Sequence, residues 1–249
     1  MSGVPDGPLR VYMGWDPRDT LAFEVAVHSL RKHASIPVEI IPLKDWELRT
    51  QGWFYRSAWI NEEGQRFDGR DGIAFSTEFS YLRFLVPLLE QHRSSWVLFT
   101  DPDVLWRADV AELFALAEAD KAVMCVKHDH RPRETLKMTG TLQRHYARKN
   151  WSSVMLIDPA KNRALTKYRV NMDSKDWLHT LAWLSDDEIG ALPEAWNWLA
   201  GWSPPEIDPK LVHFTRGTPD MPGHEDEPYA EEWRAALVET GLRLAAFPI

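Results

Sequence analysis

Two aspartates that directly follow an apolar segment are the residues of this sequence best suited to chemistry. The segment Ser95–Trp106 reads Ser-Trp-Val-Leu-Phe-Thr-Asp-Pro-Asp-Val-Leu-Trp, so a β-prone run ends in Asp101 and Asp103. A strand that ends here presents both carboxylates in one short turn. Carboxylate oxygens at this spacing suit Mg²⁺ or Mn²⁺ and leave coordination positions for substrate phosphates. An acidic turn after a buried strand is the alternative for this segment taken alone.

A strand–helix–strand unit is predicted at the start of the chain. The apolar run Leu9–Trp15 and the run Val38–Leu43 have the composition of strands, and the segment from Thr20 to about His33 has helical spacing between them. Such a unit makes a parallel pair with a right-handed crossover. Ligands bind beyond the carboxyl ends of such strands, so residues 14–20, with Asp16, are expected at the functional edge.

The rest of the chain continues the alternation of the two element types. Strands are predicted over 96–100, 122–126 and 154–158 and around 211–213, and helices over 75–89, 110–116, 177–184 and 230–244. Residues 44–74 are rich in aromatic side chains but show no period, which predicts a long ordered loop of the kind that often binds ligands. The pattern indicates an α/β fold.

Composition excludes some classes of protein. The 249 residues carry a net charge of −8, which argues against a general nucleic-acid binder. Residues 1–8 lack the features of a signal peptide, and no apolar run reaches the ~18 residues of a transmembrane helix. The single cysteine, Cys125, predicts a reducing compartment, so a cytoplasmic location is expected.

Several polar residues follow one another in a recognisable order. They are Asp16, Arg83 in an apolar segment, Asp101-x-Asp103, the polar strand entry Asn150-Trp151-Ser152-Ser153, the acidic cluster Asp186-Asp187-Glu188, and His213-Phe214-Thr215-Arg216-Gly217. Over roughly residues 9–223 this order resembles nucleotide-sugar-dependent glycosyltransferases of the GT-A fold. It is similar to the family-8 group that includes glycogenin and bacterial lipopolysaccharide galactosyltransferases.

The resemblance implies a fold and an activity. The fold would be a single GT-A (Rossmann-like) α/β domain over residues 1–249, with a mixed, mainly parallel central sheet flanked by helices. Residues 1–8 would be a flexible N-terminus and 224–249 a closing helical segment. The activity would be metal-dependent transfer of a sugar, with retention, from a nucleotide sugar to a glycan or other hydroxyl acceptor. A UDP-sugar is favoured as donor, and peripheral association with a membrane is compatible with these features.

The resemblance also implies roles for single residues. Asp101, Asp103 and His213 would bind Mn²⁺ or Mg²⁺, and Asp101 would also lie near the ribose. The other residues implied to contact the nucleotide sugar are Asp16, Arg83, Asn150, Ser152 and Arg216. Asp186 and Asp187 would be catalytic, because they fall where the family contacts the donor sugar and acceptor.

Departures from the family pattern leave alternatives open. The family's late Lys-Pro-Trp is Thr218-Pro219-Asp220 here, so Arg216 would replace the lysine, and the donor sugar and acceptor stay open. One rival is metal-dependent phosphoryl or nucleotidyl transfer, although residues 14–18 form no glycine-rich phosphate loop. Another is a non-catalytic carbohydrate-binding protein, since the 13 tryptophans could stack on sugars. His213 as an ordinary strand residue, Asp186–Glu188 as a solvated helix end, and 128–130 as a polar loop are the simpler readings of those segments.

Overall fold

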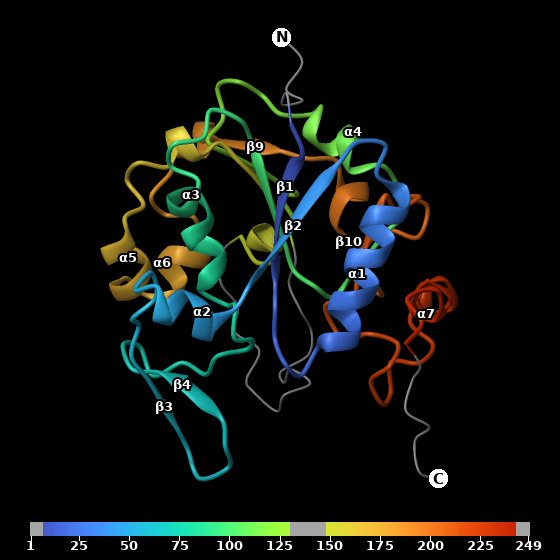
Figure 1. Ribbon diagram of the computed structural model, residues 1–249, viewed down its shortest axis with the longest axis horizontal. Coiled ribbons are helices and arrows are strands. Elements are labelled where there is room, and N and C mark those ends of the chain that lie inside the picture. Colours follow the sequence, from blue (N-terminus) through green and yellow to red (C-terminus); the bar gives the residue numbers. More distant parts are fainter. Residues whose placement is uncertain (1–6, 130–147, 243–249) are drawn as a thin grey trace.

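A six-stranded sheet forms the centre of the protein (Figure 1), which the computed structural model describes over residues 7–129 and 148–242. The strand order is β2-β1-β5-β8-β7-β9. The strands are β1 Leu9–Gly14, β2 Val38–Leu43, β5 Val97–Thr100, β7 Val123–Cys125, β8 Val154–Ile157 and β9 Ile189–Ala191. Only β8 runs antiparallel to its neighbours β5 and β7 within this sheet. The prediction of a mixed, mainly parallel sheet is confirmed.

Two smaller sheets complete the described strands. A three-stranded sheet of order β10-β11-β6 consists of β6 Val104–Trp106, β10 Trp198–Leu199 and β11 Leu211–His213. The chain therefore leaves the central sheet at the end of β5, passes through the acidic turn and enters the second sheet in β6. A separate hairpin, β3 Ala58–Ile60 and β4 Arg66–Asp68, extends away from the central sheet (Figure 1).

Helices cover both faces of the central sheet. The α-helices are α1 Thr20–His33, α2 Asp45–Thr50, α3 Val86–Leu89, α4 Val110–Phe114, α5 Lys167–Met172, α6 Lys175–His179 and α7 Ala230–Glu239. Single-turn 3₁₀ helices lie at η1 Leu82–Leu85, η2 Trp151–Ser153, η3 Pro159–Lys161, η4 Asp186–Glu188 and η5 Glu194–Asn197. Helix α1 lies on one side of the sheet with α7 beside it, and α3, α5 and α6 lie on the other (Figure 1).

The alternation of side chains along β1 divides the core into two layers. Leu9, Val11 and Met13 pack in one cluster with residues of α1 and α4, whereas Tyr12 packs in the other with residues of η1, α3 and α6. Both faces are buried, which explains why the strands read as nearly continuous apolar runs.

Several predicted elements were wrong in length or type. Residues 44–74 contain α2 and the β3–β4 hairpin instead of one long loop, and the helix predicted over 75–89 is reduced to η1 and α3. The helix predicted over 177–184 is α6, which ends at His179. Of the predicted terminal segments, residues 1–6 and 243–249 lie outside the described part of the chain. No helix within the described ranges is long and apolar enough to cross a membrane.

A buried arginine attaches the hairpin to the rest of the protein. Arg56 has a fully buried side chain and pairs through two nitrogens with the buried carboxylate of Asp68 at the end of β4. Its third nitrogen donates to the carbonyl oxygens of Val170 (3.2 Å) and Asp173 (2.7 Å) at the end of α5. The guanidinium also lies 4.1 Å from the ring centroid of Tyr81. One side chain therefore joins segments more than a hundred residues apart.

We expect Arg56→Ala to lower the free energy of unfolding by about 3–5 kcal/mol, because it leaves the Asp68 carboxylate buried without its cation. Urea unfolding at neutral pH measures the change. Lys32→Ala is the control, since it removes a half-exposed ion pair with Glu239 and should cost at most about 1 kcal/mol. Equal losses in the free energy of unfolding for the two substitutions would show that the buried Arg56–Asp68 pair contributes no more to stability than an exposed ion pair.

Candidate metal centre

Asp101, Asp103 and His213 converge at the carboxyl end of β5. Each offers one ligand atom, and these atoms lie within 4.8 Å of one another. The two aspartates occupy the turn between β5 and β6, and His213 is the last residue of β11. Strand β11 pairs antiparallel with β6 so that His213 lies opposite Val104, and the backbone nitrogen of Phe214 donates to the carbonyl oxygen of Asp103 (2.9 Å). Backbone pairing thus brings the histidine to the acidic turn.

Asp101 is held on two sides. Its backbone nitrogen donates to the carbonyl oxygen of Ser153 (2.9 Å). Its carboxylate forms an ion pair with Arg83, with 3.0 Å between Nη2 and Oδ1. Arg83 also donates to the carbonyl oxygen of Ser152 (2.8 Å) and lies over the ring of Phe99. Arg83, for which the family resemblance implied a contact with the nucleotide sugar, therefore pairs with Asp101 and orients its carboxylate.

Burial and like charges shift the proton affinities of this group. Burial, together with the nearby charge of Asp103, raises the pKa of Asp101 to about 6. Burial by itself would lower the pKa of His213, but the carboxylates of Asp103 and Asp101 outweigh it and raise that pKa above the usual value. The pKa of Asp19 is raised to about 7 by burial and by Asp103. Asp19 was not among the candidate site residues of the sequence analysis, and the influence of Asp103 on its pKa places it near the acidic turn.

The donor set fits a divalent cation. Oδ1 of Asp101 and Oδ1 of Asp103 are buried and accept no well-aligned hydrogen bond from the described residues, although the first lies 3.0 Å from Nη2 of Arg83 and the second 3.3 Å from Nε2 of His213. Buried carboxylate oxygens with incomplete hydrogen bonding are costly, and a cation bound between them would satisfy both. Two carboxylates and one imidazole suit Mn²⁺ better than Mg²⁺, because Mg²⁺ strongly prefers oxygen ligands.

The second ring nitrogen of His213 has a partner of its own. Nδ1 lies 2.8 Å from Oδ1 of Asn197, a fully buried residue at the end of η5, while Nε2 lies 3.3 Å from Oδ1 of Asp103. Sequence reasoning did not single out Asn197. Asn197 belongs to no sequence motif, and only its contact with His213 in the folded protein identifies it as part of the site.

Asp16 follows β1 but does not point a free carboxylate at the ligand group. It is fully buried, and its oxygens accept from the side chain of Arg18 and from the backbone nitrogens of Arg18 and Glu78. These charged and neutral donors lower its pKa against the opposing effect of burial. Asp16 thus ties the loop after β1 to the segment before η1, on the same edge of the sheet as the acidic turn.

Asn150 and Ser152 are linked to the ligand group through Asn197 and Arg83, and Arg216 lies three residues after His213. Asn150 adopts a left-handed conformation (φ 64°) and begins the turn into β8. Ser152 is buried, with its hydroxyl 3.2 Å from Nδ1 of His179. Arg216 follows His213 by three residues, packs against Gly201 and lies 3.7 Å from Glu227. All three segments lie at the edge where β5 ends.

Asp186 and Asp187 lie elsewhere. They belong to η4, which precedes β9, and the backbone nitrogen of Ala122 at the start of β7 bonds to Glu188 of the same turn. Because β5, β7 and β9 share one direction, η4 lies at the edge where β5 begins, opposite the acidic turn. Asp186 is 84% exposed and paired with Arg148. Neither residue belongs to the ligand group, although Arg148 links Asp186 to the turn that holds Asn150 and Ser152, and the catalytic role of both aspartates stays a prediction.

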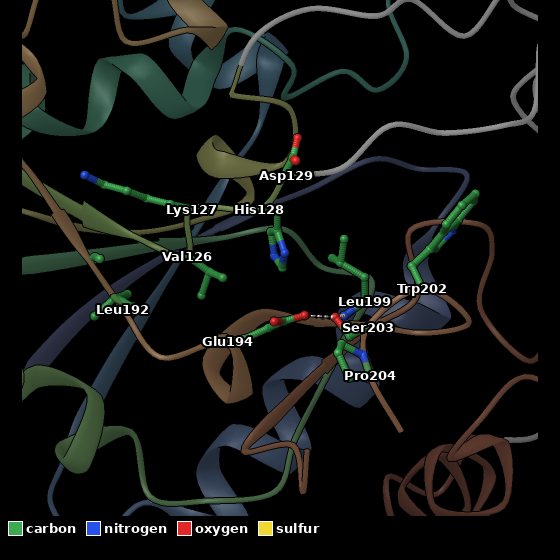
Figure 2. Close-up of a pocket in the computed structure, with 11 residues that line it drawn as sticks. Val126, Lys127, His128, Asp129, Leu192, Glu194, Leu199, Trp202, Ser203 and Pro204 are labelled. Carbon is green, nitrogen blue, oxygen red and sulfur yellow. Dashed lines mark hydrogen bonds between the residues drawn. The ribbon is translucent and has the colours of Figure 1, made fainter. Parts of the chain in front are cut away.

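A pocket of about 470 Å³ lies between the segment after β7 and the segments around β9 and β10 (Figure 2). It is lined by Val126–Asp129, which follow β7, by Ala191, Leu192 and Glu194, and by Leu199, Trp202, Ser203 and Pro204. Leu199 of β10 lies opposite His213 in the parallel pair β10–β11, which links the pocket to the strand that carries the histidine. His128 and Asp129 line this pocket, and His130 lies outside the described residues.

One curated relative matches most of the chain. It is Protein CDI of Arabidopsis thaliana, 42% identical over 239 residues that cover 93% of this chain and 87% of the relative. No protein-family model matches the sequence.

Solved glycosyltransferase structures share the fold. The bifunctional glycosyltransferase WbbM superposes with a TM-score of 0.62 at 14% identity, over 94% of this chain and 50% of WbbM. The galactosyltransferase LgtC, in complex with donor and acceptor sugar analogs, gives 0.57 at 13% identity over 96% of this chain and 98% of LgtC. The glycosyltransferase GlyE of Streptococcus pneumoniae superposes with a TM-score of 0.53 at 13% identity, over 93% of this chain and 61% of GlyE. The chain spans about half the length of WbbM, and identities this low establish the fold alone.

We expect Asp103→Asn to abolish Mn²⁺ binding measured by calorimetry, because it removes one hard anionic ligand. The metal-free variant should unfold at the same or a higher temperature than wild type, since the substitution also removes a like charge beside Asp101. Asp120→Asn, at an exposed aspartate paired with Lys121, is the matched control and should bind Mn²⁺ as wild type does. Undiminished Mn²⁺ binding by Asp103→Asn would show that this turn is not the metal site.

The increase in melting temperature that Mn²⁺ causes should grow with pH. The raised pKa values of Asp101 and His213 mean that this group stabilises the metal-free fold at low pH, and that this contribution is lost as the pH rises through those pKa values. Mn²⁺ requires the deprotonated ligands, so its affinity changes in the opposite sense. Thermal unfolding with and without Mn²⁺ from about pH 5.5 to about pH 8 tests this. An increment independent of pH would contradict it.

Proposed function

We propose that this chain, which belongs to the family of Protein CDI and has the fold of glycosyltransferases, is a metal-dependent glycosyltransferase. It would transfer a hexosyl group from a nucleoside-diphosphate sugar to a glycan or another hydroxyl acceptor. The observation that carries the proposal is the Asp101–Asp103–His213 group, whose three ligand atoms lie within 4.8 Å of one another at the edge where ligands bind in such sheets.

The proposed roles of the residues follow from their positions. Asp101, Asp103 and His213 would hold Mn²⁺, which when bound neutralises the charge that develops on a diphosphate leaving group. Arg83 keeps the Asp101 carboxylate oriented through its ion pair and its bond to Ser152. Arg216 is the cation that we propose for the diphosphate, because it lies in the turn that follows His213 at the end of β11.

The donor is proposed to lie along the edge from β1 to β8. The loop that Asp16 ties down would form one side of the nucleotide site, and the turn with Asn150 and Ser152 would contact the donor sugar. UDP as the nucleotide, retention at the anomeric carbon and membership of family 8 rest on the sequence resemblance. The first product of an α-linked donor, observed by proton NMR, would be α-linked if the transfer is retaining.

The acceptor is proposed to enter the pocket of Figure 2. Its size falls within the range of small-molecule sites, and its lining combines an indole, Trp202, with the polar side chains of His128 and Glu194 (Figure 2). Aromatic faces and a few fixed polar groups are suited to a sugar. Glu194 accepts from the hydroxyl of Ser203 at 2.5 Å, which fixes its carboxylate at the pocket wall.

The rival functions use the same residues differently. Phosphoryl or nucleotidyl transfer would also need the metal group, but the glycosyltransferase fold favours sugar transfer. A carbohydrate-binding protein without activity would not need buried carboxylates at a metal position. The single cysteine, Cys125, is buried in β7. Because one cysteine cannot form a disulfide within the chain, we propose the cytoplasm as the location.

A panel of nucleotide sugars tests the proposal. We expect slow hydrolysis of one donor, most readily a UDP-sugar, in the presence of Mn²⁺, and loss of that hydrolysis with EDTA or in Asp103→Asn, because the leaving diphosphate then lacks its counter-charge. Asp120→Asn should retain it. Release of inorganic phosphate instead of a nucleoside diphosphate would favour phosphoryl transfer, and binding of sugars without any turnover would favour a binding protein.

A further inference from the structure

We infer that Asn197 is a positioning residue that fixes the ring of His213 with its proton on Nδ1 and its free electron pair on Nε2, toward Asp101 and Asp103. The inference rests on the metal site of the proposed function. Asn197 itself does not touch the ligand atoms of the two aspartates, so it would act through His213 alone.

Two hydrogen bonds determine the orientation of the Asn197 amide. Oδ1 lies 2.8 Å from Nδ1 of His213, and Nδ2 donates to the carbonyl oxygen of Asn150 at 3.3 Å. A carbonyl oxygen can only accept, so the NH₂ group must face Asn150. The amide oxygen is therefore left to face His213, and exchanging the two amide atoms would break the bond to Asn150.

The orientation of the amide in turn determines the tautomer of His213. An amide oxygen also only accepts, so Nδ1 of His213 must carry a hydrogen to make the 2.8 Å contact. In the neutral ring the free electron pair then resides on Nε2, the nitrogen that lies 3.3 Å from Oδ1 of Asp103. Metal-binding histidines commonly donate their other N–H to a fixed oxygen, which sets both the tautomer and the ring angle.

The same side chain links His213 to the turn that holds Asp101. Asn150 begins this turn, Ser153 of the turn accepts from the backbone nitrogen of Asp101, and Ser152 accepts from Arg83. Asn197 bonds to Asn150 with one end and to His213 with the other. It therefore connects the ligand from β11 with the ligands that follow β5.

Local structure brings Asn197 to this place. It is the last residue of η5 and directly precedes β10, whose Leu199 lies opposite His213 in a parallel pair. The side chain is fully buried, so both amide groups depend on these two partners. Burial without them would be costly, which is expected to keep the amide in this orientation.

The test measures Mn²⁺ affinity by electron paramagnetic resonance titration without any nucleotide sugar. Asn197→Leu should weaken binding by about 10–100-fold, the usual effect of losing such a partner. Asn197→Asp keeps an acceptor for Nδ1–H and should lose less. In a His213→Ala background, Asn197→Leu should cause no further loss, because the residue acts only through the histidine.

Asn171→Leu is the matched control. Asn171 is also fully buried and also bonds to backbone groups, those of Trp53, Tyr55 and Lys167, far along the chain from the metal group. It should lower the melting temperature without changing Mn²⁺ affinity. If Asn171→Leu lost as much Mn²⁺ affinity as Asn197→Leu, the loss would be explained by general destabilisation, and the inference would be overturned.

A spectroscopic signature completes the test. In the protein loaded with diamagnetic Zn²⁺, long-range ¹H–¹⁵N NMR should show His213 protonated at Nδ1 and bound through Nε2. Binding through Nδ1, or an unchanged affinity in Asn197→Leu, overturns the inference and leaves the proposed function standing. A wild-type protein that binds no Mn²⁺ overturns both.

Discussion

Two carboxylates of like charge at the end of one strand, Asp101 mostly buried and Asp103 about a third exposed, are the constraint on which the rest of this structure depends. Asp101 and Asp103 repel each other, and burial makes that repulsion stronger, as the raised pKa of Asp101 shows. Such a pair persists only where positive charge and donors are supplied. Arg83 supplies one cation from behind Asp101, and His213 lies against Asp103. The ligand atoms of Asp101, Asp103 and His213 lie within 4.8 Å of one another, close enough to share the cation that we propose.

The fold meets this constraint by joining two sheets at the acidic turn. The central sheet delivers Asp101 through β5, and the second sheet delivers His213 through β11, which pairs with the strand that follows Asp103. Backbone hydrogen bonds from Asp101 to Ser153 and from Phe214 to Asp103 fix both approaches. Ligands carried on paired strands are held more precisely than ligands on free loops, which suits the binding of an ion and a charged donor that we propose.

Sequence reasoning worked where the pattern is long and local. The βαβ unit and the strand before Asp101 appear as predicted, because strands buried on both faces read as apolar runs. It failed over residues 44–74, where a six-residue helix and two three-residue strands are too short to show a period. These short elements are held by a tertiary contact, the burial of Arg56 against Asp68 and α5, which no local pattern announces.

The sequence alone determined the α/β class and marked Asp101 and Asp103 as candidate metal ligands, because the type and spacing of these residues limit what they can bind. It also brought His213 into the ligand set, although only through resemblance. The tertiary structure decided which polar residues meet. It placed Asp19 and Asn197 beside the ligand group and left Asp186 and Asp187 at the opposite edge of the sheet. The physical reason is that strand direction and strand order determine which loops meet at one edge of the sheet. Neither property can be deduced from a single segment of the chain.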